Sequence, residues 1–332
     1  MDSLVTRGSI LLETRLTPGR RPQTLLRYTS TGSWPVQLAI SSLPGGGATF
    51  VLDQADKLAH AVVSLPHTER LETIQITYSW DAPRKWGRLV MLHVDSGRFA
   101  ISELTEPAPI RLSDLEAMIH EQNATFITPD AEFLAVSTEI EPTGPCPSLV
   151  ARTPIETPLG EVPVARLRRG NTVRTETGDS VPVLFKLSRT VPARGSFAPV
   201  RLRAPYFGLR RDTLVAPTQR LKISGSVVDY MFSTEAVLAS ASHLVGGTAI
   251  ADRDHPSFVT YHHVLLPQHE AILSSGMALE SLYIGRLRRK KDLLAATVLA
   301  GLDRARLPEH STPAFPILRQ YDALVLAEQR SA

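Results

Sequence analysis

Cysteine is almost missing from this chain of 332 residues, which contains only Cys146. A single cysteine excludes an intramolecular disulfide and leaves the redox compartment open. Aromatic residues are also few, at 6%, while there are 25 prolines. This composition favours many short strands and loops over long helices. The length is sufficient for two domains, each with a core of its own.

Long hydrophobic runs and a strong charge of one sign are absent as well. The formal net charge of +3 is small for this length, so bulk charge predicts no nucleic-acid partner. The apolar run at residues 10–12 is interrupted by Glu13 and Arg15, which makes it too short for a signal peptide. No later run reaches membrane-spanning length. We expect a soluble protein with no N-terminal signal peptide, either cytoplasmic or exported by another route.

Short runs of apolar and β-branched residues fill the segment from residue 20 to residue 105. Several of them alternate apolar and polar residues, and turn signals such as Pro44 to Gly47 separate them. Six runs are strand candidates: 24–28, 36–40, 48–52, 61–65, 73–78 and 87–92. Antiparallel strands at this spacing predict a β-sandwich domain over residues 1–105.

Residues 106–147 read as a linker. Residues 112–120 have apolar side chains at helical spacing and a serine near their start, which predicts one short helix. The proline-rich run from Glu139 to Pro147 then marks the expected domain boundary.

The stretch from Ser148 to Ile223 consists of short runs rich in Val, Leu, Ile and Thr, each ended by Gly, Pro or Asp. No helix-length apolar stripe fits between these breakers. The rhythm is typical of short strands joined by tight turns.

A series of motifs from residue 146 to residue 285 resembles the bacterial Hint-2 domains, which have the hedgehog and intein self-processing fold. The segments that carry the resemblance are Arg152 to Gly160 (RTPIETPLG), Val162-Pro163-Val164, Leu167 to Thr175, Val215 to Arg220 (VAPTQR, for the family's SPQHR), Val259 to His262 (for VTYxH), His269-Glu270, Gly276 and Glu280 to Leu282. The order of the series, rather than any single motif, supports the resemblance. It implies a Hint-type all-β domain over residues 148–285.

The resemblance also implies a nucleophile that attacks the carbonyl group before it, a role that cysteine fills best. Counting back from Thr153, itself a candidate site residue, places Ser148 at this position. Cys146 could serve only if the loop were two residues longer. A proline, Pro147 or Pro145, precedes either residue and restricts the presentation of the scissile carbonyl.

The family's activating histidine corresponds to Gln219, which cannot transfer a proton. We therefore favour a degenerate Hint domain that does not process itself. The alternative is a self-cleaving domain that uses Ser148 or Cys146, with His262 or His269 in place of the missing histidine. Full splicing is excluded because it needs a terminal asparagine, and the chain has Asn only at positions 123 and 171.

The segment from Tyr78 to Leu89 is similar to one that precedes some Hint-2 domains in a concanavalin-like sandwich, a fold that often binds sugars or proteins. Trp80, Arg84 and Trp86 either form a ligand edge for a sugar or an anion, or belong to a hairpin in which the tryptophans cap the sandwich. We favour the hairpin, and keep a carbohydrate-binding module as a third interpretation. The partner is expected to be a protein or a glycan.

The histidines between residues 243 and 269 show no metal-binding spacing, so we expect neither a metal nor a cofactor. Residues 286–332 predict a C-terminal helical extension packed on the Hint domain. A basic run, Arg286 to Lys291, precedes a helix expected over 292–306, and a final extended segment is expected near 315–326. The basic run could make a weak contact with an anionic surface, but more often such a run is solvated.

Overall fold

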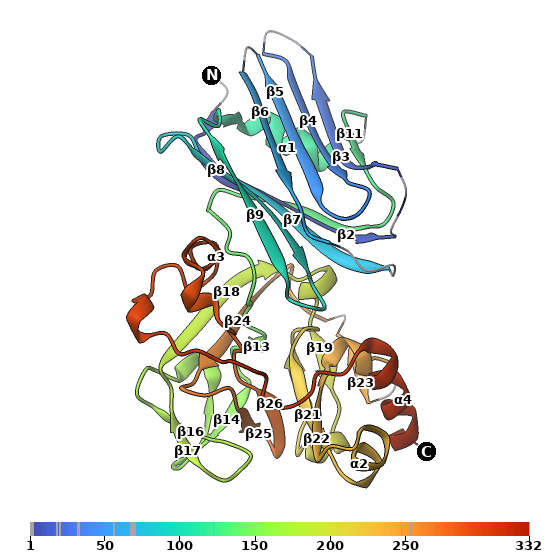
Figure 1. Cartoon of the computed structure of the whole chain (residues 1–332), viewed down its shortest axis with the longest axis vertical. Coiled ribbons are helices and arrows are strands. Elements are labelled where there is room, and N and C mark those ends of the chain that lie inside the picture. The colour runs from blue at the N-terminus through green and yellow to red at the C-terminus, as the bar shows by residue number, and fades with distance from the viewer. Residues whose placement is uncertain are drawn as a thin grey trace. The chain divides into compact units, whose positions relative to one another are not determined.

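The computed structural model of the chain describes residues 3–331 except 18, 20, 32, 33, 56, 67–70, 122, 247 and 253. The chain divides into two compact units, Met1–Gly144 (unit 1) and Pro145–Ala332 (unit 2). Strands dominate both units, and every extended ladder is antiparallel (Figure 1). The prediction of a mainly β protein is confirmed.

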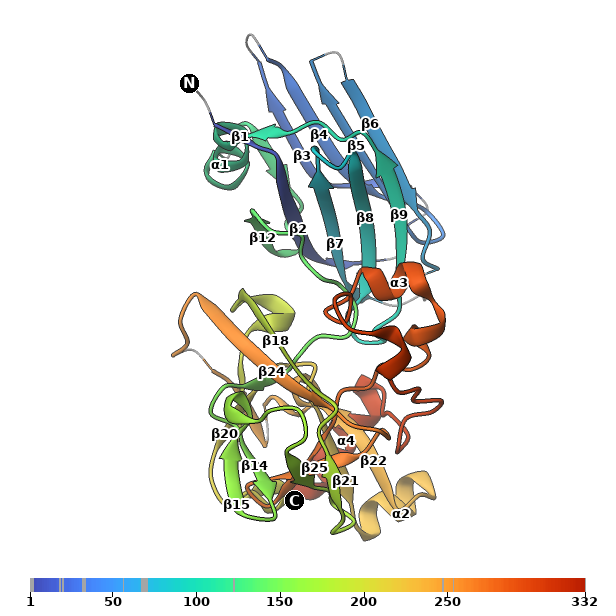
Figure 2. The ribbon, with the colours of Figure 1, turned by 90° about the vertical axis from the view of Figure 1, so that its left-hand side faces the viewer.

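Unit 1 is a sandwich of two five-stranded sheets, with strand orders β11-β3-β4-β5-β6 and β12-β2-β7-β8-β9, which Figure 2 shows as two layers. The strands are β2 (Arg7–Leu16), β3 (Gln23–Ser30), β4 (Val36–Ser42), β5 (Ala48–Gln54), β6 (Lys57–Val63), β7 (Glu72–Asp81), β8 (Trp86–His93), β9 (Phe99–Thr105), β11 (Thr125–Ile127) and β12 (Ala131–Ser137). A short pair, β1 (Leu4–Val5) and β10 (Ile110–Arg111), lies outside the two sheets. All six predicted strands correspond to strands of this sandwich.

The core of unit 1 follows the two-residue period of its strands. Leu38 and Ile40 of β4 and Phe50 of β5 alternate with more exposed residues and point inward. The Phe50 ring stacks on Tyr78 with 4.0 Å between centroids, and Tyr78 stacks on Trp80 at 5.6 Å. This aromatic stack joins the two sheets.

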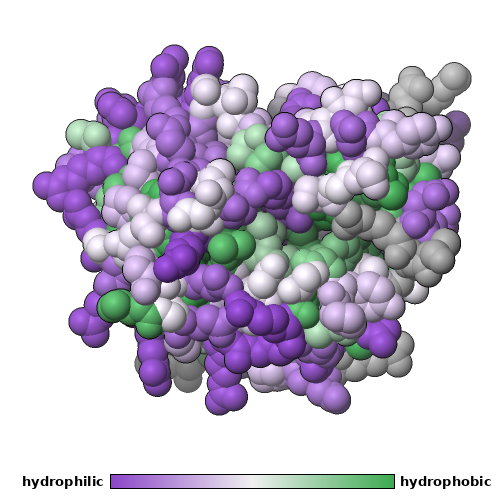
Figure 3. All heavy atoms as spheres, turned by 90° about the horizontal axis from the view of Figure 1, so that it is seen from below, coloured by the Kyte–Doolittle hydropathy of each residue, from purple (hydrophilic) through white to green (hydrophobic). Residues whose placement is uncertain are grey.

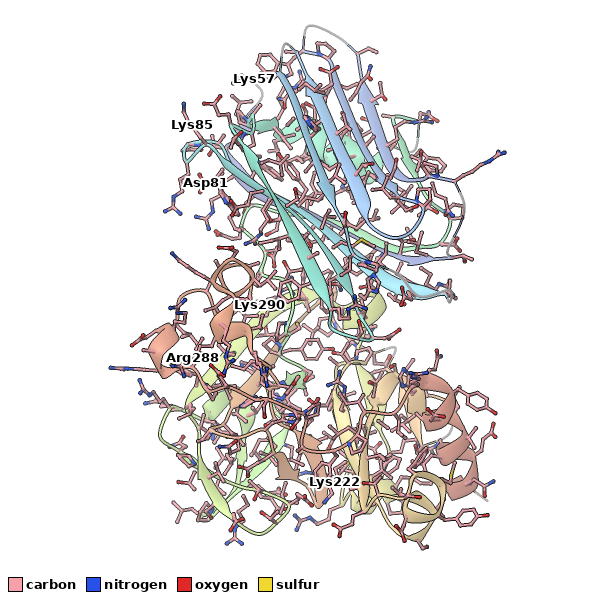
Figure 4. All side chains as sticks on the ribbon, in the orientation of Figure 1. Lys57, Asp81, Lys85, Lys222, Arg288 and Lys290 are labelled. Atoms are coloured by element: carbon pink, nitrogen blue, oxygen red, sulfur yellow. The ribbon has the colours of Figure 1, made fainter. Side chains whose placement is uncertain are left out.

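Trp80 belongs to the hydrophobic core of unit 1. Its side chain is fully buried, and its indole Nε1 donates a hydrogen bond to the carbonyl oxygen of Val5 at 3.0 Å. Arg84, in the β7–β8 turn, is exposed, and its guanidinium lies 3.7 Å from the carboxylate of Asp81. Figure 4 labels Asp81 and Lys85 of this turn. Trp86 is half-buried, with the Arg88 guanidinium 5.1 Å from its ring centroid. The arrangement agrees with a structural hairpin.

The structure differs from the sequence-based expectation for residues 106–147. The predicted helix is present as α1 (Leu112–His120), but its N-cap is Arg111, and the buried Asp114 accepts a hydrogen bond from the hydroxyl group of Tyr28 at 2.9 Å. Strand β11 then pairs with β3, and β12 pairs with β2. The segment therefore supplies one edge strand to each sheet, and it belongs to unit 1 because these ladders bind it there.

The chain after β12 stays on unit 1. The buried Ser9 hydroxyl donates to the carbonyl oxygen of Glu139 at 2.8 Å and accepts from the amide of Glu141 at 2.9 Å. Arg7 pairs with the Glu139 carboxylate. Gly144 has a φ of +85°, and a Cβ there would lie 2.8 Å from the Phe99 ring. The end of the predicted linker is therefore bonded to β2 of unit 1.

Unit 2 contains a six-stranded sheet, β18-β24-β13-β20-β19-β23, a four-stranded sheet, β22-β21-β26-β25, and two hairpins, β14-β15 and β16-β17. Their strands are β13 (Leu149–Val150), β14 (Pro154–Thr157), β15 (Gly160–Pro163), β16 (Thr172–Arg174), β17 (Ser180–Pro182), β18 (Phe185–Pro192), β19 (Val200–Leu202), β20 (Thr213–Val215), β21 (Arg220–Ser224), β22 (Ala236–Ser240), β23 (Ala249–Ala251), β24 (Phe258–Leu265), β25 (Ala271–Ser274) and β26 (Met277–Glu280). Helix α2 (Ser226–Phe232) follows β21. Most of these strands are short, as the turn residues of this region predict.

The C-terminal part of unit 2 differs from the expectation. The predicted helix over 292–306 stops early, as α3 (Lys291–Ala295), because the Thr297 hydroxyl bonds the carbonyl oxygen of Leu294 and the amide of Leu299. The expected final strand is instead helix α4 (Gln320–Ser331), whose Ala323 and Leu326 are buried in the main core of the unit. The extension does pack on the rest of the unit.

The basic run begins this extension (Figure 4). Arg288 donates to the carbonyl oxygen of Leu307 at 3.2 Å, and Arg289 forms an ion pair with Glu309 at 2.6 Å. Lys290 and Lys291 are exposed. Arg288 and Arg289 therefore form contacts within unit 2. None of the described helices combines the length and the apolarity that crossing a bilayer requires.

The face of the molecule seen in Figure 3 has mostly hydrophilic margins, and hydrophobic residues gather toward a hollow near its middle. The polar site described next is buried, so its side chains are not part of this surface.

Candidate functional site

Ser148 lies at the centre of the six-stranded sheet of unit 2. It directly precedes β13, which is hydrogen-bonded to β20 on one side and to β24 on the other. The amide of Ala216, just after β20, donates to the Ser148 carbonyl oxygen at 2.7 Å. Both Ser148 and the preceding Pro147 are buried. The fold thus places the predicted nucleophile inside the unit, away from solvent.

The Ser148 hydroxyl oxygen lies between two hydrogen-bond acceptors. It is 2.6 Å from Oε1 of Gln219 and 3.0 Å from Nδ1 of His263. A tight turn positions Gln219, because its main-chain amide donates a hydrogen bond to the Ala216 carbonyl oxygen at 3.0 Å. A hydroxyl group has one proton, so only one of these acceptors can receive it at a time.

His263 is oriented as an acceptor toward Ser148. Its Nε2 is 2.9 Å from the carbonyl oxygen of Glu280, so the ring proton belongs on Nε2 and Nδ1 is left with its lone pair. Burial, with a further contribution from the nearby His269, lowers the pKa of His263 to about 4. The imidazole is therefore neutral near pH 7 and is a weak base.

Gln219 has no hydrogen left for the bond before Ser148. Its Nε2 donates to the carbonyl oxygen of Arg220 at 2.8 Å and to that of Glu280 at 3.2 Å. These two bonds use both amide hydrogens, and an amide cannot transfer a proton in any case. The Gln219 side chain thus forms hydrogen bonds with two main-chain carbonyl groups.

Glu280 contacts both side chains that surround Ser148 and two further basic side chains. Its buried carboxylate accepts hydrogen bonds from Nη1 of Arg220 at 3.0 and 3.3 Å, and Nε2 of His269 lies 3.1 Å from it. Burial alone would raise the pKa of this carboxyl group, but His269 and Arg220 outweigh that effect and hold the pKa below its usual value. Glu280 is therefore a buried carboxylate with two cationic or hydrogen-donating partners.

The other predicted site residues lie elsewhere. Cys146 is half-buried, and its sulfur is 3.9 Å from Nη1 of Arg189. The Thr153 hydroxyl donates to the carbonyl oxygen of Leu214 at 3.4 Å, a bond between main chain and side chain that supports the fold. Neither contact involves the Ser148 hydroxyl.

The histidine next to Ser148 is His263, which the sequence prediction missed in favour of His262. Successive residues of a strand point to opposite faces of the sheet, so only one of these two neighbours in β24 can point toward the Ser148 side chain. The signal was present in the VTYxH pattern, because its histidine falls two positions after Tyr261. Burial and the nearby Lys186 lower the pKa of His262. His269 reaches the site only through Glu280.

Acidification is expected to destabilise unit 2 through His263. Because its pKa is about 4 in the folded chain and about 6.5 when unfolded, the unfolded chain binds an extra proton between these values. The free energy of unfolding therefore decreases as the pH falls through this window, by up to about 3 kcal/mol for this residue. Protonation of the Glu280 carboxyl group, whose pKa is also lowered, adds to the loss at still lower pH.

The measurement is urea unfolding of unit 2 across the range from about pH 7 to about pH 4.5, for the wild type and for His263→Gln. The variant cannot titrate at this position, so its free energy of unfolding should decrease less. Equal pH dependence in the two proteins would contradict the lowered pKa.

Comparisons with known proteins give a family match for most of unit 2. Residues 147–286 match the Hint_2 family, described as the Hint domain. Unit 2 contains a Hint domain. Among curated proteins no match to the chain was found.

Two solved structures are similar to the chain. One is the MchDnaB-1 intein, which is 14% identical over 40% of this chain and 98% of its own, with a TM-score of 0.28. The other is the LG1-3 region of the laminin alpha2 chain, 9% identical over 84% of this chain and 54% of its own, with a TM-score of 0.27.

The part of the chain that the structure describes contains no group of three or more His, Cys, Asp or Glu arranged to hold a metal ion. The side chains that meet at this site are the Ser148 hydroxyl, the neutral imidazole of His263 and the Gln219 amide.

Proposed function

We propose that this protein joins a β-sandwich with a binding role to a Hint domain that keeps the self-processing fold without the activity. The observation that carries the proposal is Gln219, which accepts the Ser148 hydroxyl at 2.6 Å and commits both amide hydrogens to main-chain carbonyl groups. The site is therefore packed as a closed hydrogen-bond network around the nucleophile position.

Self-processing would require a balanced transfer of protons at the bond between Pro147 and Ser148. The Ser148 oxygen would bond to the Pro147 carbonyl carbon and lose its proton, and the C–N bond would break while the Ser148 nitrogen gains a proton. His263 is placed to accept the first proton, but its low pKa makes it a weak base. The residue that should supply the second proton is a glutamine, so the leaving amine receives no proton from that position.

The alternative is an active self-cleaving domain, and the contact of 3.0 Å between Ser148 and His263 favours it. In this case His263 would act as general base, and cleavage would release residues 1–147. Cys146 is a weaker candidate because its sulfur contacts Arg189, which is not one of the side chains around Ser148.

The binding role of unit 1 is supported by exposed apolar side chains on the outer face of its first sheet. Leu58 and Val62 of the edge strand β6 are more than half exposed, and Val51 of β5 pairs with His60, the residue between them on the same face. Apolar residues gathered on one surface mark interaction sites, which favours a protein as partner over a glycan.

The proposal is tested by the intact mass of purified protein after overnight incubation, with and without a thiol and hydroxylamine. We expect the full-length mass of 36.3 kDa in every sample. A fragment that ends at Pro147, present in the wild type and absent from Ser148→Ala, would establish the alternative. Cys146→Ala is the matched control, since a loss of cleavage in that variant would assign the cut to the cysteine.

A further inference from the structure

The segment 307–318, which we call the strap, lies outside the residues that match the Hint domain and connects the region after α3 to α4. In Figure 1 it is the red segment that crosses unit 2. Near its start, the amide of His310 donates to the Gly285 carbonyl oxygen at 3.0 Å. At its end, the main chain of Leu238 in β22 bonds the Pro316 carbonyl oxygen and the Leu318 amide, each at 2.8 Å. Both ends are therefore anchored.

The middle of the strap contacts the site network. The amide of Ala314 donates to Nδ1 of His269 at 2.8 Å. The next residue, Phe315, makes a cation–π contact with Lys222 (Figure 4). The ammonium nitrogen of Lys222 lies 4.6 Å from the centroid of the Phe315 ring. Ala314 itself is exposed, so its contribution to the contact comes from the main chain.

This hydrogen bond selects one tautomer of His269. An Nδ1 that accepts a hydrogen bond has no proton, so the ring proton belongs on Nε2. Nε2 lies 3.1 Å from the Glu280 carboxylate, which also favours a proton there. The opposite tautomer would direct two lone pairs at each other and leave the Ala314 amide without its acceptor.

Glu280 connects this histidine to Ser148. Its carbonyl oxygen is contacted by Nε2 of His263 at 2.9 Å and by Nε2 of Gln219 at 3.2 Å. These two side chains are the ones that hold the Ser148 hydroxyl. Polar contacts therefore connect the strap to the Glu280 carboxylate, and the main-chain carbonyl group of the same residue to the nucleophile position.

We propose that the strap is a positioning segment of the Hint site. The Ala314 amide fixes the tautomer of His269, and His269 with Arg220 holds the Glu280 carboxylate. The main-chain carbonyl oxygen of the same residue contacts the two side chains around Ser148. His269 is thus a positioning residue that acts through Glu280 and does not touch the bond before Ser148. The inference relies on the proposed function only for the identity of Ser148 as the nucleophile position.

The first test uses the full-length wild-type chain labelled with ¹⁵N. We expect a scalar coupling through the hydrogen bond between the Ala314 nitrogen and Nδ1 of His269, and ring signals of a single Nε2–H tautomer. Absence of the coupling, or an Nδ1–H tautomer, would overturn the proposal. This readout does not depend on cleavage, so it is separate from the mass measurement that tests the proposed function.

The second test compares Ala314→Pro, which removes the amide hydrogen, with Ala314→Ser, which keeps it. We expect a mixture of His269 tautomers in the proline variant and the wild-type pattern in the serine variant. When both are placed in a chain made cleavable by Ser148→Cys and Gln219→His, the proline variant should cleave about tenfold more slowly. A single Nε2–H tautomer in Ala314→Pro would contradict the proposal, as would equal rates for the two variants.

Discussion

A chain that carries both Ser148→Cys and Gln219→His is expected to cleave before residue 148, at least about a hundredfold faster than the wild type. The thiol of a cysteine is more acidic and more nucleophilic than the serine hydroxyl, which removes the need for a strong base. A histidine at position 219 can donate a proton to the departing amine, which the present glutamine cannot do. Ser148→Cys thus supplies the nucleophile, and Gln219→His supplies the proton donor for the leaving amine.

Mass spectrometry over a time course, with hydroxylamine to trap the ester or thioester, measures this effect. The two single variants are the controls, and each is expected to cleave more slowly than the double variant because it restores one half only. Ser148→Ala with Gln219→His should not cleave at all. If the folded double variant is as inert as the wild type, the loss of activity lies in a feature other than these two residues.

Glu280→Gln is expected to lower the free energy of unfolding of unit 2 by about 3 kcal/mol, the scale of breaking a buried ion pair from one side. The substitution leaves the shape almost unchanged, but it removes the negative charge that faces Arg220 and His269. The guanidinium of Arg220 is largely buried, so solvent cannot replace the lost partner. The carbonyl oxygen of residue 280, which contacts Gln219 and His263, is not altered.

Urea unfolding near pH 7, with hydrogen exchange to assign the transition to unit 2, measures this change. Glu309→Gln is the matched control, because it removes a carboxylate that pairs with Arg289 at an exposed position, where an ion pair contributes little. An effect of Glu280→Gln no larger than that of the control would show that the carboxylate is dispensable for stability.

Much of the sandwich could be predicted from local patterns, because residues that alternate in sequence alternate between core and surface in a strand. The six predicted strands all occur, as does helix α1. Strand β2 was missed because it is buried on both faces and does not alternate. Strands β11 and β12 are recognised by their pairing with β3 and β2, which no local pattern reveals.

Local sequence patterns predicted only part of the site, because the rest depends on strand pairing and main-chain contacts. The order of motifs identified Ser148 and Gln219, and the structure places their side chains in contact. The choice between His262 and His263 depends on the register in which β24 pairs with β13, because the register decides which histidine lies beside Ser148. The role of Ala314 could not be predicted, since it comes from a main-chain amide, and any residue except proline provides one.

The hydrogen bonds that Ser9 makes with Glu139 and Glu141 have a consequence for the products of any cut before residue 148. The new carboxyl terminus would lie only a few residues beyond a segment already attached to β2. A released unit 1 would thus end in a short C-terminal extension, which leaves little unfolded chain for proteases to cleave. In a cleavable variant, the liberated sandwich should persist as a discrete fragment.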